Sequence, residues 1–506
     1  MERRQAIKNI LGFTAAAAVT PLPALAKLNI EESDPLKLNA KLFNQALKSE
    51  PNLLGFIGLE DNIAPQKLPI EGKLPSDFSG TFYRNGPAIH QRQDQRYLHL
   101  FEGDGMIQQF SFSSQGISHQ AKFVNTNKFE QEQKAGKFLF SAPDSKLENT
   151  LPVTSPDTIN AANTNVLPVN GELWALWEGG SATSLNAETL ETKGLVNLGA
   201  HSKYGNALKG LAFSAHPKVD PDGTIWNFGS TATGDIVLYH INNKGITQKV
   251  NILKTNYHGG MLHDFLVTDK HLLIILPSLK RDRRNHRLFN AVEFDKNLPM
   301  RVLVVDKNTL TLKREYALNA GFAFHFGNAW EDPKGNIRFD ASLYPNVDNL
   351  HYLSDIMKGL ISEAGHAETT FFTLYANGKT DQQTVSGISE FPRIYDHLTG
   401  LKNKMLVTLS SVESDVWSDS VRTINTETGK QDTFVYGKDF LVEEHIIVDK
   451  SQHEGKGYLV GTALHIPSQR TCVNIFKASH VSDGPICRAW LPQFLPLGFH
   501  GNFLHS

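Results

Sequence analysis

The sequence predicts an all-β protein built as a single β-propeller, with helices and loops that cap one face of the ring. Short strand-like runs alternate with turn residues, and a strand–turn–strand unit recurs at a spacing of roughly 40–65 residues. The composition agrees, because 40% of residues are hydrophobic, only 20% are charged, and 39 glycines and 23 prolines supply turns. One unit cannot bury both faces of its sheet, so we expect the units to stack into a closed ring. Tandem β-sandwiches and a β-helix are the alternatives.

The repeating unit joins an apolar strand to a turn rich in Asn, Asp, Gly and Thr, after which a second strand begins. No Pro- or Ser-rich linker and no low-complexity stretch interrupts the chain after residue 27, so we expect one domain over residues 27–506. The clearest units occupy residues 109–116, 173–189, 236–245, 301–309, 421–429 and 473–485.

Residues 1–26 have the pattern of an export signal. Arg3 and Arg4 precede an apolar stretch over residues 10–19, which is shorter than the ~20 residues of a membrane-spanning helix. The segment 24–26 matches an A-x-A cleavage site. The paired arginines resemble the twin-arginine signal with which bacteria export folded proteins, so we expect a periplasmic protein. A general secretory signal and a membrane anchor are the alternatives.

The formal charge is close to zero, with 50 Lys plus Arg against 52 Asp plus Glu. Proteins that bind nucleic acid normally carry a basic excess, so no nucleic-acid partner is expected. The two cysteines, Cys472 and Cys487, are too few for a disulfide-stapled scaffold or a thiolate zinc site. They flank a predicted hairpin, where either one disulfide or two free thiols would fit.

Residues 351–363 depart from the strand pattern and predict a helix, because apolar side chains recur there at helical spacing. This face either packs in the core as a capping helix or forms an apolar rim at a cavity entrance, in peripheral contact with a bilayer. The face comprises Tyr352, Leu353, Ile356, Met357, Leu360 and Ile361.

Four of the 20 histidines lie among apolar or small residues, where a buried imidazole needs a partner. Each of them taken singly is better explained as a core histidine whose hydrogen bonds are satisfied. Their separations of 47, 62 and 175 residues exclude a local metal finger, but they suit residues brought to a propeller axis by different blades. These residues are His216, His263, His325 and His500.

Several ordered motifs, together with these histidines, resemble the carotenoid cleavage oxygenase family, which includes the lignostilbene dioxygenases. The resemblance runs from Leu68 to Phe503 and is therefore more specific than any single motif. The motifs are residues 80–87 (GTFYRNGP), 99–106 (HLFEGDGM), 175–180 (ALWEGG), 390–394 (EFPRI) and 498–503 (GFHGNF).

The resemblance implies a seven-bladed propeller with non-haem Fe(II) held on its axis by His216, His263, His325 and His500. Imidazole is a suitable ligand for Fe(II), and four ligands leave two octahedral positions open. His258 lies close to His263 in the sequence and competes with it for a ligand position.

Outer carboxylates are expected to accept the second ring N–H of such histidines. The family's glutamates map onto Glu178, Glu390 and Glu444, although the neighbouring Glu443 is an alternative to Glu444. Arg84 and Arg393 are expected to be buried and paired rather than catalytic.

The implied reaction adds O2 across a conjugated C=C bond of an apolar small molecule and yields two carbonyl products. Carotenoids or apocarotenoids are the favoured substrates, and stilbenes are the alternative. Lys128 matches a lysine that grips a phenolic hydroxyl in the lignostilbene branch, whereas the matching tyrosine is out of register. Gln95 occupies its place and Tyr97 lies two residues on. A surface position for Lys128 and a non-catalytic propeller that binds an apolar ligand are further alternatives.

Overall fold

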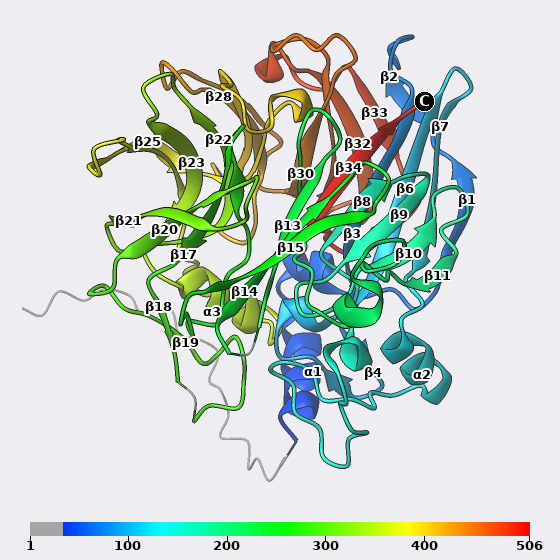
Figure 1. Cartoon of the computed structure of the whole chain (residues 1–506). Coiled ribbons are helices and arrows are strands. Elements are labelled where there is room, and N and C mark those ends of the chain that lie inside the picture. Colours follow the sequence, from blue (N-terminus) through cyan, green and yellow to red (C-terminus); the bar gives the residue numbers. More distant parts are fainter. Residues whose placement is uncertain (1–33, 232, 283) are drawn as a thin grey trace, which may run out of the picture.

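The computed structural model describes residues 34–506 except residues 232 and 283, so the predicted signal peptide lies outside the described residues. Within this part, seven sheets of four or five antiparallel strands form the blades of a propeller (Figure 1). The three α-helices of the described residues lie in the lower half of Figure 1, on one side of the blades, and form the predicted cap. The prediction of a capped seven-bladed propeller is confirmed.

The first three blades take their strands mainly from the N-terminal half of the chain. Blade 1 contains, in sheet order, β1 (Ile63–Lys67), β7 (Gly116–Phe123), β6 (Asp104–Ser113), β3 (Gly80–Ile89) and β34 (His500–His505). Blade 2 contains β11 (Thr192–Leu195), β10 (Thr183–Asn186), β9 (Glu172–Leu176) and β8 (Asn165–Val169). Blade 3 contains β12 (Lys218–Val219), β13 (Ile225–Ser230), β14 (Asp235–Ile241) and β15 (Thr247–Lys254).

The other four blades come mainly from the C-terminal half. Blade 4 contains β16 (Leu266–Val267), β17 (His271–Leu276), β20 (Met300–Asp306) and β21 (Leu312–Leu318). Blade 5 contains β22 (Phe322–Glu331), β23 (Ile337–Tyr344), β24 (Glu368–Leu374) and β25 (Thr380–Ile388). Blade 6 contains β26 (Glu390–Arg393), β27 (Met405–Ser410), β28 (Ser420–Asn425) and β29 (Gln431–Val435). Blade 7 contains β2 (Ile70–Gly72), β33 (Cys487–Trp490), β32 (Arg470–Lys477), β31 (Tyr458–His465) and β30 (Phe440–Val448).

The remaining elements lie outside the blades. Two small hairpins consist of β4 (Gln91–Arg92) with β5 (Gln95–Arg96) and β18 (Leu279–Arg281) with β19 (Val292–Phe294). The α-helices are α1 (Pro35–Ala46), α2 (Asn127–Ala135) and α3 (Asp348–Ile356). Short 3-10 turns are η1 (Pro51–Phe56), η2 (Leu100–Glu102), η3 (Pro156–Ile159), η4 (Gly205–Leu208), η5 (Asp396–Leu398) and η6 (Val481–Asp483).

The ring closes through blade 1, which combines strands from both ends of the chain. β34 pairs antiparallel with β3, in register from Asn85 opposite His500 to Gly80 opposite His505. The Asn502 side-chain amide also donates to the carbonyl of Val166 in blade 2, at 2.6 Å. Closure of this kind leaves no gap between the first and last blades, and it brings His500 to the axis.

The predicted strand–turn–strand units are hairpins within blades. In residues 236–245, for example, the Asn242 side-chain oxygen accepts hydrogen bonds from the backbone N–H groups of Lys244 and Ile246, both at 3.0 Å. Gly245 completes this turn with φ +76°, a left-handed conformation that favours glycine. The turn chemistry that is visible in the sequence therefore positions the strands as expected.

The predicted helix over residues 351–363 is shorter than expected, because α3 ends at Ile356. Gly359 adopts φ +79°, and this left-handed residue turns the chain away from the helical path. Tyr352, Leu353, Ile356 and Met357 are buried in one cluster with Leu36 and Phe43 of α1, so this face is core. Leu360 beyond the helix is 53% exposed, and peripheral membrane contact through this region stays a prediction.

The two cysteines are free thiols, and the predicted option of a disulfide is wrong. The register of β32 and β33 places Cys487 opposite Ile475, three residues from Cys472. Successive side chains of a strand point to opposite faces, so an offset of three residues sends the two sulfur atoms to different sides of the sheet. Cys472 belongs to the core cluster that contains Leu409, whereas Cys487 belongs to the cluster that contains Phe82.

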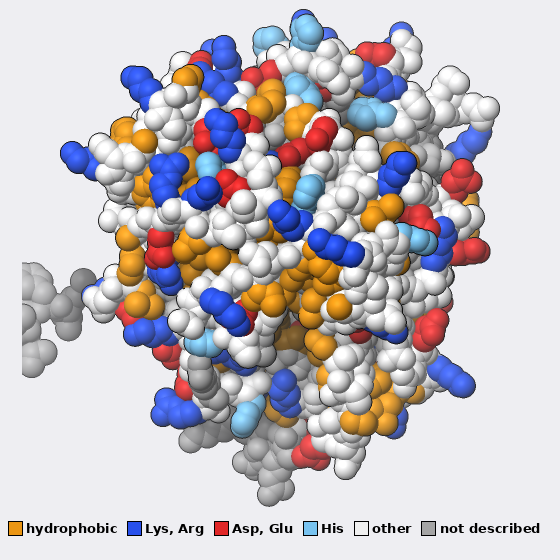
Figure 2. All heavy atoms as spheres, in the orientation of Figure 1, with side chains coloured by type: hydrophobic (Ala, Val, Ile, Leu, Met, Phe, Trp, Pro, Cys, Tyr) orange, Lys and Arg blue, Asp and Glu red, His pale blue; other side chains and the backbone are white. Residues whose placement is uncertain are grey.

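Charges of both signs are interspersed over the face shown in Figure 2, so this face presents no extended region of one sign. Among the described residues, no helix combines the length and the apolar character needed to cross a bilayer.

Candidate metal centre and its cavity

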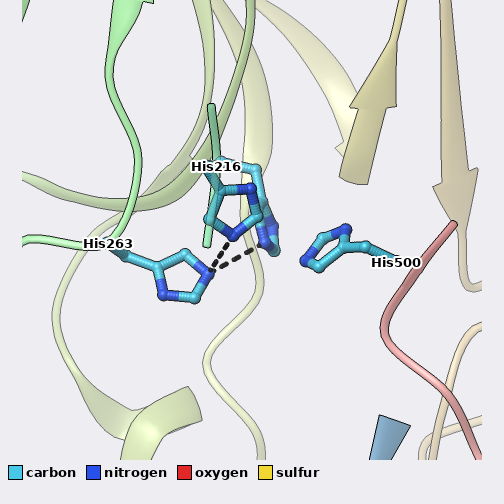
Figure 3. A group of neighbouring side chains, drawn as sticks. His216, His263 and His500 are labelled. Atoms are coloured by element: carbon cyan, nitrogen blue, oxygen red, sulfur yellow. Dashed lines mark hydrogen bonds between the residues drawn. The ribbon is translucent and has the colours of Figure 1, made fainter. Parts of the chain in front are cut away.

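The four histidines singled out in the sequence meet at the propeller axis. His216 precedes β12, His263 precedes β16, His325 lies on β22, and His500 begins β34, so each comes from a different blade. One ring nitrogen of each histidine lies within 4.8 Å of the corresponding nitrogens of the others. The Nε2 atom of His263 is 2.9 Å from Nε2 of His216 and 3.2 Å from Nε2 of His325. Figure 3 shows three of these imidazoles pointing toward one another.

Three carboxylates hold the second ring nitrogen of three of the histidines. Glu390 Oε2 lies 2.5 Å from Nδ1 of His325, and Glu444 Oε1 lies 3.0 Å from Nδ1 of His500. Glu178 Oε1 lies against Nδ1 of His263. A carboxylate that accepts the Nδ1 proton leaves the lone pair on Nε2, so these rings face the axis as donors to a metal. Among the residues that the structure describes, no carboxylate contacts the second ring nitrogen of His216.

The three glutamates come from the three blades that supply no histidine. Glu178 follows β9 in blade 2, Glu390 begins β26 in blade 6, and Glu444 lies on β30 in blade 7. Every blade therefore contributes one ionisable side chain to the centre. Local turns cannot produce this arrangement, because it requires closure of the whole ring.

A bulge in β22 positions His325. The register of β22 with β23 shifts around Phe326, and the backbone N–H groups released by this shift find carboxylates. Phe326 N–H donates to Asp264 Oδ2 at 3.0 Å, whereas Gly327 and Asn328 both donate to Asp340 at 3.1 Å. Sequence reasoning missed both aspartates; for Asp264, its position next to His263 was the available signal.

Burial and the neighbouring charges shift the pKa values of three of the four histidines. Burial, together with the neighbouring histidines, holds the pKa of His216 well below its usual value. Burial lowers the pKa of His500 to about 4, although Glu444 opposes it. Burial also lowers the pKa of His325, but the Glu390 carboxylate outweighs it and the net pKa is raised.

This donor set fits a divalent transition metal. Four buried imidazole nitrogens converge, no carboxylate lies among the converging atoms, and outer carboxylates orient three of the rings. His258 lines the neighbouring cavity but is not a member of the converging group.

The structure distinguishes between the two adjacent glutamates of β30. Glu444 contacts His500, whereas Glu443 pairs with Arg84 and accepts from Thr462 Oγ1 and the Gly498 backbone N–H. Arg84 is buried and paired as expected. Arg393 is half-buried, with Nη1 3.8 Å from Glu444 Oε1. Burial raises the pKa of Glu444, but Arg393 and His500 outweigh it and lower the value to about 2.

A cavity of about 1350 Å³ reaches the metal centre. His263, His325 and His500 form part of its wall, and aromatic rings surround them. Phe391 stacks on His325 with ring centroids 5.0 Å apart, and Phe101 stacks on His263 at 6.5 Å. The other phenylalanines of the wall are Phe228, Phe289, Phe324 and Phe499. The cavity can therefore hold an extended apolar molecule beside the metal centre.

Lys128 and Tyr97 lie together in a buried cluster. The Lys128 side chain is 1% exposed, so the alternative of a surface position is wrong. Its Nζ contacts Asp104 Oδ1 at 2.6 Å and Glu132 Oε2 at 3.2 Å, and it lies 5.1 Å from the centre of the Tyr97 ring. Lys128 also lines the cavity. Gln95 instead donates to Asp34 Oδ2, at 2.7 Å.

The fold and the centre together define a class of protein, namely a β-propeller with an axial four-histidine metal site beside an apolar cavity. Comparison with known proteins identifies the family. Residues 59–505 match the family model of the retinal pigment epithelial membrane protein. The chain therefore belongs to this family, which is that of the carotenoid cleavage oxygenases.

Named relatives include enzymes that act on different substrates. The chain is 27% identical over 466 residues to the apocarotenoid-15,15'-oxygenase of Synechocystis, which covers 86% of this chain and 92% of that protein. It is 28% identical over 467 residues to the lignostilbene-alpha,beta-dioxygenase isozyme III of Sphingomonas paucimobilis, covering 86% and 93%. A solved structure of the cobalt-substituted Synechocystis apocarotenoid oxygenase has a TM-score of 0.79 at 24% identity, covering 90% of this chain and 99% of that one.

Proposed function

We propose that this protein is a non-haem Fe(II) dioxygenase that cleaves a conjugated C=C bond of a carotenoid or apocarotenoid into two carbonyl products. The observation that carries the proposal is the convergence of four buried imidazole nitrogens at the wall of a large aromatic-lined cavity. The similarity to oxygenases over most of the chain supports the same reaction class.

The reaction breaks the C=C bond, and both atoms of O2 end in the two new C=O groups. Fe(II) at the four histidines would supply the route by which O2 reacts with the double bond. The chain supplies the geometry: Glu178, Glu390 and Glu444 hold three imidazoles in place. The phenylalanine wall binds the polyene and keeps water from the reacting atoms. The position of the polyene in the cavity determines which C=C bond is cleaved.

The surroundings of Lys128 favour a polyene over a hydroxystilbene. A lysine that grips a phenolate uses its positive charge, but the charge of Lys128 is already offset by two buried carboxylates. These contacts also occupy two of its three N–H donors. Stilbene cleavage stays the second candidate, because the lignostilbene dioxygenase relative is as similar to this chain as the apocarotenoid oxygenase.

The direct test is O2 uptake with product identification, using Fe(II)-loaded protein that lacks residues 1–26. An apocarotenal in detergent and a 4-hydroxystilbene are offered side by side. We expect two carbonyl products and one O2 consumed per polyene, with little cleavage of the stilbene. Cleavage of the stilbene alone would reverse the substrate assignment, and Lys128 with Tyr97 would then be the phenol grip.

The iron content of the isolated protein separates catalysis from ligand binding. An enzyme of the proposed type binds about one iron per chain through the four histidines. A protein that binds the polyene tightly without iron, and consumes no O2 after Fe(II) is added, would be a binding propeller instead.

We further propose that the protein is exported to the periplasm by a twin-arginine signal. The proposal rests on Arg3, Arg4 and the segment 24–26, which lie outside the described residues. Export after folding would allow Fe(II) to be bound in the reducing cytoplasm.

A further inference from the structure

Phe391 has an unusual backbone conformation beside the metal centre. Its φ is +52°, in the left-handed region that non-glycine residues rarely adopt. The following residue is Pro392, which disfavours the ordinary helical conformation at position 391. The pairing of β26 with β27 also shifts in register between Glu390 and Arg393. Such strain persists only where surrounding contacts enforce it, and it is common at functional sites.

Contacts with the metal centre hold Phe391 in this conformation, and the residue also packs against a core cluster that contains Leu409 and Val442. The Phe391 backbone N–H donates to Glu390 Oε2 at 2.7 Å, and the same oxygen lies 2.5 Å from His325 Nδ1. The Phe391 ring stacks on the His325 imidazole with an interplanar angle of 28° and centroids 5.0 Å apart. Glu390 therefore holds the edge of this imidazole while Phe391 covers its face.

The same ring contacts a second histidine of the centre. The centroids of Phe391 and His500 are 5.2 Å apart, at an interplanar angle of 50°. A phenyl ring placed against two imidazoles restricts the rotation of both, which keeps their Nε2 atoms directed at one point. Phe391 also lines the cavity, so its ring forms part of the apolar wall beside the metal centre.

We propose that Phe391 is a positioning residue whose strained backbone holds its ring against His325 and His500, and thereby preorganises these two metal ligands. The inference rests on the metal site of the proposed function. It predicts that the backbone strain at Phe391 lowers folding stability, whereas its ring strengthens metal binding. An ordinary core phenylalanine would not show both effects.

The test compares Phe391→Ala with Phe391→Gly. Both variants lack the ring, but only glycine adopts φ +52° without strain. We expect Phe391→Gly to have the higher urea midpoint in the metal-free protein, although glycine normally destabilises a strand relative to alanine. The Gln469→Gly variant is the matched control, because exposed Gln469 has φ +53° and does not line the cavity. This control variant should have a higher urea midpoint than the wild-type protein and unchanged metal binding.

Metal binding is measured by Co(II) titration, followed by the visible absorption of the bound ion. We expect both Phe391 variants to bind Co(II) about tenfold more weakly and with a changed spectrum. Phe391→Tyr should keep the wild-type Co(II) affinity and absorption spectrum, because it retains an aromatic ring. Equal urea midpoints for the alanine and glycine variants, or wild-type Co(II) binding by both, would overturn the inference. Absence of Co(II) binding by the wild-type protein would instead contradict the proposed function.

Discussion

His325 combines three kinds of support: a bulged strand, the carboxylate of Glu390 and the ring of Phe391. Replacing it with alanine removes one of the four proposed metal ligands but leaves the backbone contacts of the bulge. We expect His325→Ala to lose iron and turnover while keeping its circular dichroism spectrum. Metal analysis of the purified variant checks this expectation, and retention of one iron per chain would remove His325 from the ligand set.

The adjacent glutamates of β30 offer a matched pair of substitutions, one expected to act mainly on metal affinity and the other mainly on stability. Glu444→Gln weakens the hydrogen bond to His500, so we expect metal affinity to fall about 10- to 100-fold. It also removes the charge beside Arg393, so some loss of stability is expected as well. Glu443→Gln leaves the buried Arg84 without its counter-ion, and we expect a loss of about 3–5 kcal/mol in unfolding free energy.

Urea unfolding of the metal-free proteins and metal titration of the folded ones measure the two effects separately. If the Glu443 variant lost metal affinity and the Glu444 variant kept it, the two roles would be exchanged.

At the scale of elements, the bulge in β22 depends on the carboxylate of Asp340. Burial raises the pKa of Asp340 from 3.8 to about 7, although the N–H groups of Asn328 and Gly327 oppose the shift. A carboxyl whose pKa is higher in the folded state stabilises the fold below its unfolded pKa. This contribution is lost as the pH rises from about 4 through about 7.

We therefore expect the melting temperature of the wild-type protein to decrease between pH 5 and pH 8 by more than that of Asp340→Asn, which cannot ionise. Calorimetry at the two pH values provides the comparison. The same decrease in both proteins would show that other groups cause it.

At the scale of the whole molecule, the proposed twin-arginine signal can be tested by substitution. The twin-arginine route carries folded proteins, so a precursor in which Arg3 and Arg4 are both replaced by Lys should accumulate in the cytoplasm. Immunoblots of cytoplasmic and periplasmic fractions measure this distribution. Normal secretion of the double variant would contradict the proposal and favour a general secretory signal.

Ring closure explains why the centre forms only in the complete domain. Its seven side chains come from seven blades, and β34 supplies His500 only after it has paired with β3. The strand–turn units could be predicted from sequence, because each depends on side chains a few residues apart, as in the turn at Asn242. The end of α3 was predicted less well, since its apolar pattern continues past the left-handed Gly359.

The sequence by itself determined the propeller architecture, the four histidines and the motifs that contain Glu178 and Glu390. These features could be predicted because they depend on local sequence patterns and on the order of motifs along the chain. Only the tertiary structure decided which of Glu443 and Glu444 meets His500, and that Lys128 is buried between two carboxylates. It also decided that the cysteines lie on opposite faces of their sheet. The physical reason is that burial, strand register and ion pairing arise between residues far apart in sequence, and they become defined only when the ring closes.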